Sequence, residues 1–177
     1  TTLSGANGVA ATAGHDLTAT AATFTSANGN VALGAGNDLT LNAGSETHTS
    51  TVDTKTTSGN WNSHSTTRTH DSVSDTDAVG TAISGNAVTL TAGHDLTAQA
   101  AQVQANGAIY AAAGHDVNLT DAHDVHSEEH DVSKTSSRTF NTNVLDPRFG
   151  NVDPDKRSSN STQSITQSTS VGTLLSG

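Results

Sequence analysis

The chain has 177 residues and a formal net charge of −10 at pH 7, and only 32% of its residues are hydrophobic and 3% aromatic. Large aliphatic and aromatic side chains normally supply most of the area buried in a globular core, so this composition excludes a conventional core and leaves either disorder or small side chains stacked in regular layers. The seven lysines and arginines are scattered, which excludes a basic footprint for nucleic acid or anionic lipid, and the absence of cysteine excludes thiol catalysis, disulfides and thiolate metal sites.

The ends of the chain carry no targeting signal. No apolar run approaches the roughly 20 residues that cross a bilayer, and the chain opens with neither an initiator methionine nor a signal peptide. We therefore expect an internal fragment of a larger protein.

A short block, Ala-Gly-[His/Asn]-Asp followed by Leu or Val, recurs four times along the chain. It occupies residues 13–17, 35–39, 92–96 and 113–117. The blocks lie 22 residues apart in the first pair and 21 in the second, which predicts one solenoid coil per block. The pair is itself repeated after 78 to 79 residues, and Val-Gly-Thr at 79–81 is echoed at 171–173, where a third copy begins.

Around each block the apolar side chains keep a period of two, which predicts strands with one buried face. Two strands flank each Gly-[His/Asn]-Asp corner, and a second corner is marked by Asn-Gly or Gly-Asn, residues that reach positive φ at little cost. These second corners lie at 7–8, 28–29, 85–86 and 106–107. Because such coils stack on copies of themselves, we predict an all-β fold, a right-handed parallel β-helix (solenoid) with coils of about 21–22 residues. In this register one interior column contains Leu17, Leu39, Leu96 and Val117.

The corner aspartates are predicted to lie in register from coil to coil. They are Asp16, Asp38, Asp95 and Asp116, each preceded by His or Asn. One interpretation is a structural ladder in which these side chains hydrogen-bond the backbone of the turns. The other is calcium held between stacked carboxylates, but the blocks lack the Gly-Gly-x-Gly-x-Asp pattern of calcium-binding β-rolls. We favour the ladder.

Two long Ser/Thr-rich insertions separate the coils and divide the chain into five parts. The predicted parts are coils at 1–45, an insertion at 46–77, coils at 78–121, an insertion at 122–170 and the start of a third unit at 171–177. In the first insertion β-forming residues flank an expected turn at Ser58-Gly59-Asn60, which predicts a projecting β-hairpin. The second carries Asp-Pro at 146–147 and 153–154, which marks an irregular tip. Composition alone also allows disorder in both insertions, and we favour hairpins.

The histidines of the second insertion invite a metal-site interpretation. His123, His126, Glu128 and His130 belong to one dense run of ligand types. On a strand, His126, Glu128 and His130 would share one face while His123 points the other way. The His-Glu-x-x-His order of zinc proteases fails here, and the equivalent stretch of the first unit carries His48 alone. We therefore interpret these residues as surface histidines, only weak metal candidates, and expect neither a metal nor a cofactor.

Motifs for catalysis are missing from the sequence. It contains no Gly-x-Ser-x-Gly nucleophile elbow and no Gly-x-x-x-x-Gly-Lys phosphate loop. Carboxylate pairs for glycoside cleavage could lie along a β-helix face, but the aromatic and basic residues that hold sugar in such enzymes are few. We predict that the chain is not an enzyme, with no catalytic or cofactor-binding residues and no small-molecule substrate.

One run of the second unit carries a family resemblance. It reads Val-Thr-Leu-Thr-Ala-Gly-His-Asp-Leu-Thr at 88–97, Ala-Asn-Gly at 105–107, Ala-Ala-Gly-His-Asp-Val-Asn-Leu-Thr at 112–120 and Asp-Val-His-Ser-Glu-Glu-His at 124–130. This pattern resembles the hemagglutinin repeats of filamentous-hemagglutinin-like, two-partner-secreted exoproteins. It looks most like the second repeat region of contact-dependent growth inhibition toxins.

The resemblance implies a secreted rod on the outer-membrane surface of a Gram-negative bacterium, exported by a dedicated outer-membrane two-partner transporter. In the inhibition systems such a repeat is associated with carrying a C-terminal toxin into a target cell. In the adhesin branch it presents surfaces to host or neighbouring cells, or to carbohydrate. The aromatic candidates for such contacts on the insertions are Trp61, Phe140 and Phe149.

Overall fold

The computed structural model describes residues 1–138 and 155–177, and every element within them is a β-strand. Contacts divide the chain into two units. The first comprises residues 1–47, 76–125 and 168–177, and the second comprises 48–75 and 126–167. No helix in the described residues is long and apolar enough to cross a membrane.

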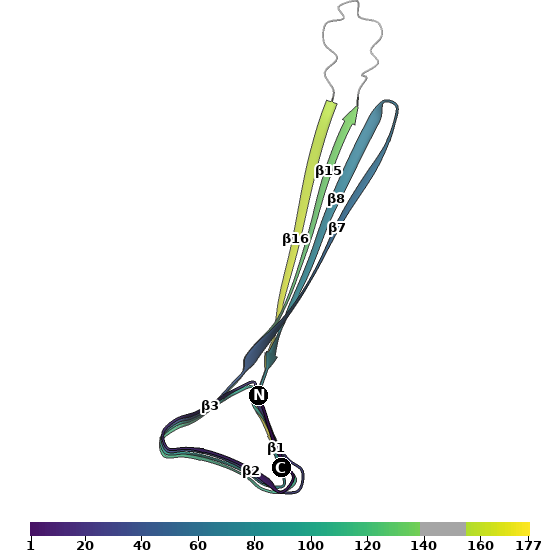
Figure 1. Ribbon diagram of the computed structural model, residues 1–177. Helices are drawn as coiled ribbons and strands as arrows, with labels where there is room; N and C mark the ends of the chain where they lie inside the picture. Colours follow the sequence, from purple (N-terminus) through teal and green to yellow (C-terminus); the bar gives the residue numbers. More distant parts are fainter. Residues whose placement is uncertain (139–154) are drawn as a thin grey trace, which may run out of the picture. The chain divides into compact units, whose positions relative to one another are not determined.

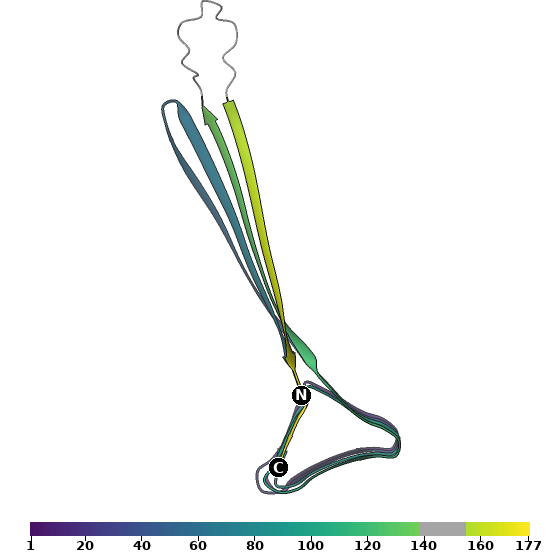
Figure 2. The same ribbon diagram turned by 180° about the vertical axis from the view of Figure 1, so that it is seen from behind.

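The first unit is a solenoid of three parallel sheets. One sheet contains, in order, β1 (Thr2–Gly5), β4 (Thr23–Ser26), β9 (Ala82–Gly85), β12 (Gln102–Ala105) and β17 (Leu174–Ser176). The next contains β13 (Ile109–Ala113), β10 (Val88–Ala92), β5 (Asn30–Ala35) and β2 (Gly8–Ala13). The last contains β14 (Val117–Thr120), β11 (Leu96–Gln99), β6 (Leu39–Asn42) and β3 (Leu17–Thr20). Each coil places one strand in each sheet, and the coils trace a triangle when viewed from either side (Figures 1 and 2).

Each coil therefore has three strands, whereas the sequence predicted two. The additional bend lies at Ala21 and Ala100, whose φ angles are 44° and 49°. Alanine rarely adopts this left-handed region because its Cβ crowds the carbonyl oxygen, so no residue type marked the bend. Backbone hydrogen bonds to the next coil hold it: the Ala21 N–H donates to Asn42 O at 3.1 Å, and the Ala100 N–H donates to Thr120 O at 3.0 Å.

The predicted interior column is present in the third sheet. Leu17 pairs in register with Leu39, Leu39 with Leu96, and Leu96 with Val117. Leu39 and Leu96, in the middle of the stack, have no exposed surface. The parallel β-helix is confirmed, and its right-handed winding stays a prediction.

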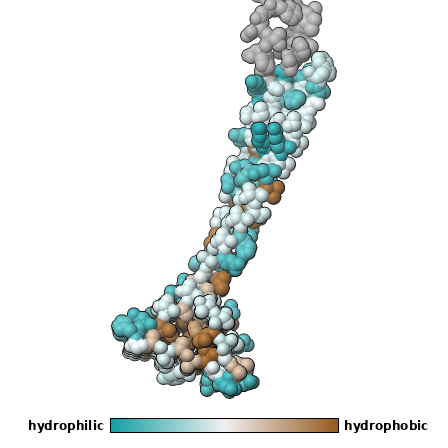
Figure 3. Space-filling view, in the orientation of Figure 1, coloured by the Kyte–Doolittle hydropathy of each residue, from teal (hydrophilic) through white to brown (hydrophobic). Residues whose placement is uncertain are grey.

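The core of the solenoid is made of small and medium aliphatic side chains in layers. The largest fully buried apolar side chains are those of Val31, Leu33, Leu39, Leu41, Ile83, Val88, Leu90 and Leu96. Figure 3 shows brown, apolar residues gathered in the coils, while mostly hydrophilic colours cover the long strands of the second unit. Regular layers thus supply the burial that large aromatic residues supply elsewhere.

A threonine stands at the start of each return to the solenoid. Thr81 is fully buried; its Oγ1 donates to Asn42 O at 3.3 Å and accepts from the Ala22 N–H at 3.4 Å. Thr173, the equivalent residue one unit later, donates to Thr120 O at 2.8 Å. The repeated Gly-Thr therefore satisfies backbone groups at the bend that the alanines form.

The second unit is a four-stranded sheet in the order β16 (Asp155–Val171), β15 (Ala122–Arg138), β8 (Ser63–Val79) and β7 (Gly44–Asn60). Side chains of β7 and β8 meet as Thr49 with Ser74 and as Thr57 with Thr66. Position rises on one strand as it falls on the other, so the pair is antiparallel. The five-part division proposed from the sequence stays a prediction.

The turn of the first hairpin lies two residues further along than predicted. β7 ends at Asn60 and β8 begins at Ser63, so the turn is Trp61-Asn62 and not Ser58-Gly59-Asn60. The Asn60 side chain accepts from the Asn62 N–H at 3.4 Å, an Asx-type contact that stabilises a turn at this place. The expected tip of the second insertion, at 146–154, lies outside the described residues.

Candidate functional site

Carboxylates link the coils at the corner between the second and third sheets. Asp16 Oδ1 accepts from the Asp38 N–H at 3.2 Å, and Asp38 Oδ1 accepts from the Asp95 N–H at 3.1 Å. Asp95 Oδ1 accepts from the Asp116 N–H at 3.0 Å. The side chains of Asp16, Asp38 and Asp95 thus each bind the backbone of the neighbouring coil.

Beside this ladder the preceding residues also face one another. The imidazole rings of His94 and His115 are stacked, with centroids 5.0 Å apart and planes 5° from parallel. Asp95 lies against both: its Oδ2 is 3.2 Å from His94 Nδ1, and its Oδ1 is 3.1 Å from His115 Nδ1. In the first pair of coils Asn37 replaces one histidine, and its Nδ2 donates to Asp16 Oδ1 at 2.9 Å.

The hydrogen bonds at this corner favour ionised aspartates. The Asn37 side chain, then His15 and the Asp38 backbone, hold the pKa of Asp16 below its usual value. Partial burial would raise the pKa of Asp95. The Asp116 backbone, the His115 hydrogen bond and the nearby imidazoles outweigh burial and lower that pKa.

A second histidine–carboxylate network lies on the hairpin sheet. His126 Nδ1 contacts Asp75 Oδ1, and its Nε2 lies 3.1 Å from Glu128 Oε1. His130 Nδ1 contacts Asp71 Oδ1. These contacts join β15 to β8. The hydrogen bond with Asp75, followed by that with Glu128, raises the pKa of His126 above its usual value.

The predicted metal candidates do not come together as one site. His126 contacts Asp75 and His130 contacts Asp71, so each histidine has a different aspartate partner on β8. Glu128 contacts His126. His123 lies an odd number of positions away on the same strand, and its Nε2 is 3.9 Å from Asp121. Among the described residues, the group of three whose donor atoms all lie within 4.8 Å of one another is His94, Asp95 and His115. The sequence signal for it was the recurrence of His in the blocks of two consecutive coils.

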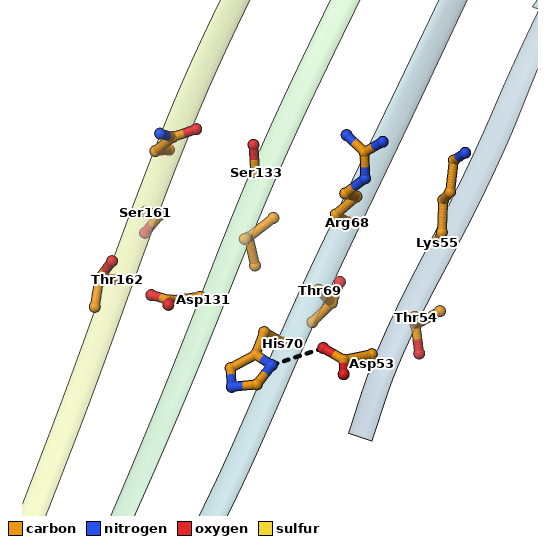
Figure 4. A pocket seen from close by; sticks show the side chains of 12 residues that line it. Asp53, Thr54, Lys55, Arg68, Thr69, His70, Asp131, Ser133, Ser161 and Thr162 are labelled. Carbon is orange, nitrogen blue, oxygen red and sulfur yellow. Dashed lines mark hydrogen bonds and ion pairs between the residues drawn. The ribbon is translucent and has the colours of Figure 1, made fainter. Parts of the chain in front are cut away.

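The opposite face of the hairpin sheet carries a polar hollow of about 500 Å³ (Figure 4). The His70 Nδ1 donates to Asp53 Oδ1 at 2.6 Å, and this bond, with the charges of Asp53, Asp131 and Glu129, raises the pKa of His70. Asp131 has a buried Oδ1 with no hydrogen-bond partner among the described residues. Lys55 and Arg68 also line the hollow and contribute positive charge. Such a lining can hold a polar, hydroxyl-bearing ligand but offers no aromatic surface for stacking.

Of the aromatic candidates, the described residues include one. Trp61 forms half of the first hairpin turn and is 84% exposed. Phe140 and Phe149 lie outside the described residues. Tyr110, which the sequence analysis did not single out, is 59% exposed on β13.

Comparison with known proteins agrees with the repeat architecture. The hemagglutinin repeat family matches residues 1–137 and, in a second alignment, 62–174. No curated protein and no solved structure matches. The family is structural and adhesin-type and is not a known enzyme family. With both two-coil units and both hairpins matched, the chain belongs to the hemagglutinin repeat family, whose members are structural repeat segments of large secreted exoproteins.

Proposed function

We propose that this chain is a stalk and delivery segment of a contact-dependent growth inhibition toxin. The observation that carries the proposal is open-ended stacking: every coil presents the same apolar layer to its neighbour in the same register. A segment of this kind would serve as an extended, stiff spacer, and this role needs no catalytic residue.

The outermost coil of this segment offers apolar side chains on which a further coil could stack. Leu96 is fully buried, whereas its register partner Val117 is 46% exposed. The same contrast separates Ala98, 2% exposed, from its partner Leu119, 47% exposed. Val117 and Leu119 are more exposed than their partners because, in this segment, no coil stacks on the far side of β14. A further coil stacked there would bury them.

The hairpins also add to one another. β8 of the first hairpin neighbours β15 of the second in one sheet, and the His126–Asp75 and His130–Asp71 contacts join them. Successive units therefore contribute to two growing structures, a solenoid and a hairpin sheet. Both features suit a rod built from many copies of one unit.

Export and location follow from the family in the same proposal. Hemagglutinin repeat proteins are usually exported by two-partner transporters and bind surfaces. We place the full protein at the outer-membrane surface of a Gram-negative bacterium, with an outer-membrane transporter as its export partner and a target-cell surface as its contact. The function requires neither nucleic acid nor a small-molecule substrate.

The test removes one unit from the full-length exoprotein in the producing bacterium. Residues 79–170 can be deleted without a register break, because Leu174 of β17 and Ala82 of β9 occupy the same register position against Gln102. After the deletion β17 would take the place of β9 beside β4. The control is the full-length exoprotein with the single substitution Trp61→Ala, which alters the first hairpin turn but keeps both repeat units. We expect the deletion to preserve surface display of an N-terminal epitope and to reduce growth inhibition of contacted target cells. Producers of the intact exoprotein that bind target cells but never inhibit their growth would overturn the delivery role.

A second candidate function is adhesion through the hairpins to carbohydrate or to a host or neighbouring cell. The polar hollow with the unpartnered Asp131 Oδ1 favours it. Asp131→Asn and Arg68→Ala would then each weaken cell binding by the full-length exoprotein, whereas Ser133→Ala would change it little. Unchanged binding in both charged variants would exclude this hollow as the adhesive surface.

A further inference from the structure

The solenoid corner after β10 and β13 combines two imidazoles and a carboxylate in a way that its structural role does not require. The aspartates hydrogen-bond the next coil at every corner, including the one where Asn37 stands in place of histidine. The turn therefore forms equally well with asparagine. The paired histidines need a separate explanation.

The two rings are held in place by the coil spacing. The His115 N–H donates to His94 O at 2.8 Å, and the His94 N–H donates to Asn37 O at 2.9 Å. This backbone ladder fixes the two Cα atoms one coil apart, and the rings stack 5.0 Å apart as a result. Both Nδ1 atoms face the same carboxylate, that of Asp95.

The separations between each imidazole nitrogen and the Asp95 carboxylate are compatible with a small transition-metal ion. Zinc binds imidazole nitrogen and carboxylate oxygen at about 2.0–2.2 Å, so two ligands of a tetrahedral site lie about 3.3 Å apart. The two Nδ1–Asp95 distances are 3.2 and 3.1 Å. All three donor groups lie within 4.8 Å of one another.

We propose that His94, Asp95 and His115 form a binding site for a divalent transition-metal ion such as Zn²⁺. On binding, the two exposed rings would turn out of their stacked arrangement so that each Nδ1 points at the ion. Asp95 would supply a carboxylate oxygen, and water would complete the coordination. Asp38, whose Oδ1 is 3.4 Å from His94 Nδ1, and Asp116, whose Oδ2 is 3.2 Å from His115 Nδ1, add negative charge around the ion. Two nitrogen ligands favour zinc, nickel or copper over calcium, which prefers oxygen alone.

The chain carries its own control for this proposal. At the corresponding corner of the first unit, His15 is followed one coil later by Asn37, which donates to Asp16. A single imidazole with an aspartate lacks the second nitrogen ligand. The metal site is therefore expected between the coils that carry His94 and His115, and not between the coils that carry His15 and Asn37.

The experiment titrates Zn²⁺ alone into the 177-residue chain and follows the imidazole resonances by NMR, with calorimetry for affinity. We expect the resonances of His94 and His115 to shift first. His94→Asn and His115→Asn should each weaken zinc binding at this corner at least about tenfold. Both variants should fold, because asparagine already occupies the equivalent position at Asn37, and circular dichroism checks this. His15→Ala is the matched control and should leave the affinity unchanged.

A gain-of-site variant sharpens the test. Asn37→His places an imidazole between His15 and His94 in the stack, so the chain should bind additional zinc at the same corner. Calcium in place of zinc should shift none of these resonances. Zinc that first shifts His126 or His130 and leaves His94 and His115 unchanged, or equal affinity in wild type and His115→Asn, would overturn the proposal.

Discussion

Leu39 and Leu96 lie side by side in adjacent strands of one sheet, both fully buried, although 57 residues and an entire hairpin separate them in the chain. The pairing shows that the solenoid resumes the same register after a long excursion. Stability therefore depends on interior columns that cross the boundary between sequence repeats.

Substituting the column tests this dependence. Leu39→Asp or Leu96→Asp would bury an unpaired charge and should lower the free energy of unfolding by at least about 3 kcal/mol, enough to unfold several coils. Thermal unfolding followed by circular dichroism measures the loss. Val117→Asp lies in the same column but is half-exposed, so its loss should be clearly smaller. Equal losses at Leu96 and Val117 would contradict the stacking argument.

His126→Ala makes the corresponding surface comparison. His126 is partly exposed, and its ion pairs with Asp75 and Glu128 are screened by solvent. We expect the melting temperature of the solenoid to stay close to that of the unmodified chain. A melt lowered as far as that of Leu96→Asp would refute the division into a buried column and a solvated sheet.

The corner glycines provide a test of close coil spacing. A Cβ at Gly93 would lie 2.0 Å from the backbone oxygen of Gly36, whereas a Cβ at Gly14, in the first coil, would meet nothing within 4 Å. Gly93→Ala should therefore destabilise the chain by about 1–3 kcal/mol or more, and Gly14→Ala should be close to neutral. Chemical denaturation of the two variants measures the difference, and similar midpoints would be inconsistent with the observed stacking.

The hairpin sheet should be more stable at pH 6 than at pH 8. The pKa of His70 is raised by Asp53, Asp131 and Glu129, and the pKa of His126 by Asp75 and Glu128. Since folding raises these pKa values, the stabilisation is complete below the ordinary histidine pKa of about 6.5 and is lost as pH rises through the raised values.

Amide hydrogen exchange in β8 and β15, corrected for intrinsic rates, measures this dependence. His126→Asn keeps a hydrogen-bond donor but cannot titrate, so its variant should lose part of the pH dependence. Protection that is the same at pH 6 and pH 8 in the unmodified chain would show that the histidine pairs do not stabilise the sheet.

Zinc binding by the hairpin histidines should be weak. His126 and His130 contact different aspartates, and His123 lies on the other face of the strand. In the His115→Asn background, calorimetry at neutral pH should show no zinc affinity tighter than about 1 µM, because no surrounding groups hold these rings around one point. Nanomolar binding that disappears in His126→Ala would instead make the hairpin a metal site.

The period-two pattern predicted the solenoid well because a slip of one residue would expose every side chain of the Leu39 column. The bends at Ala21 and Ala100 were not predicted, since alanine carries no preference for positive φ and the coil-to-coil hydrogen bonds that hold it there are not visible in one coil's sequence. The hairpin turn was misplaced by two residues because Ser58-Gly59-Asn60 and Asn60-Trp61-Asn62 both contain good turn residues, and strand pairing decides between them.

For the sites, the sequence indicated which residues share a strand face but not which strands become neighbours. The alternation of side chains along a strand predicted that His126, Glu128 and His130 share one face. The aspartate partners of the two histidines, on β8, depend on how the two hairpins pair, which the sequence did not reveal. The sequence predicted that the corner residues lie in register from coil to coil, but the ring contact of His94 with His115 and their approach to Asp95 were seen only in the structure.

The equivalence of β9 and β17, which pair with the same strand β12 in the same register, has a consequence for inheritance. Unequal recombination between the gene segments that encode the two repeat units would add or remove a whole unit, and the coils on either side of the junction would still stack in register. The number of coils in such a repeat segment can thus change in one genetic event at little cost to folding.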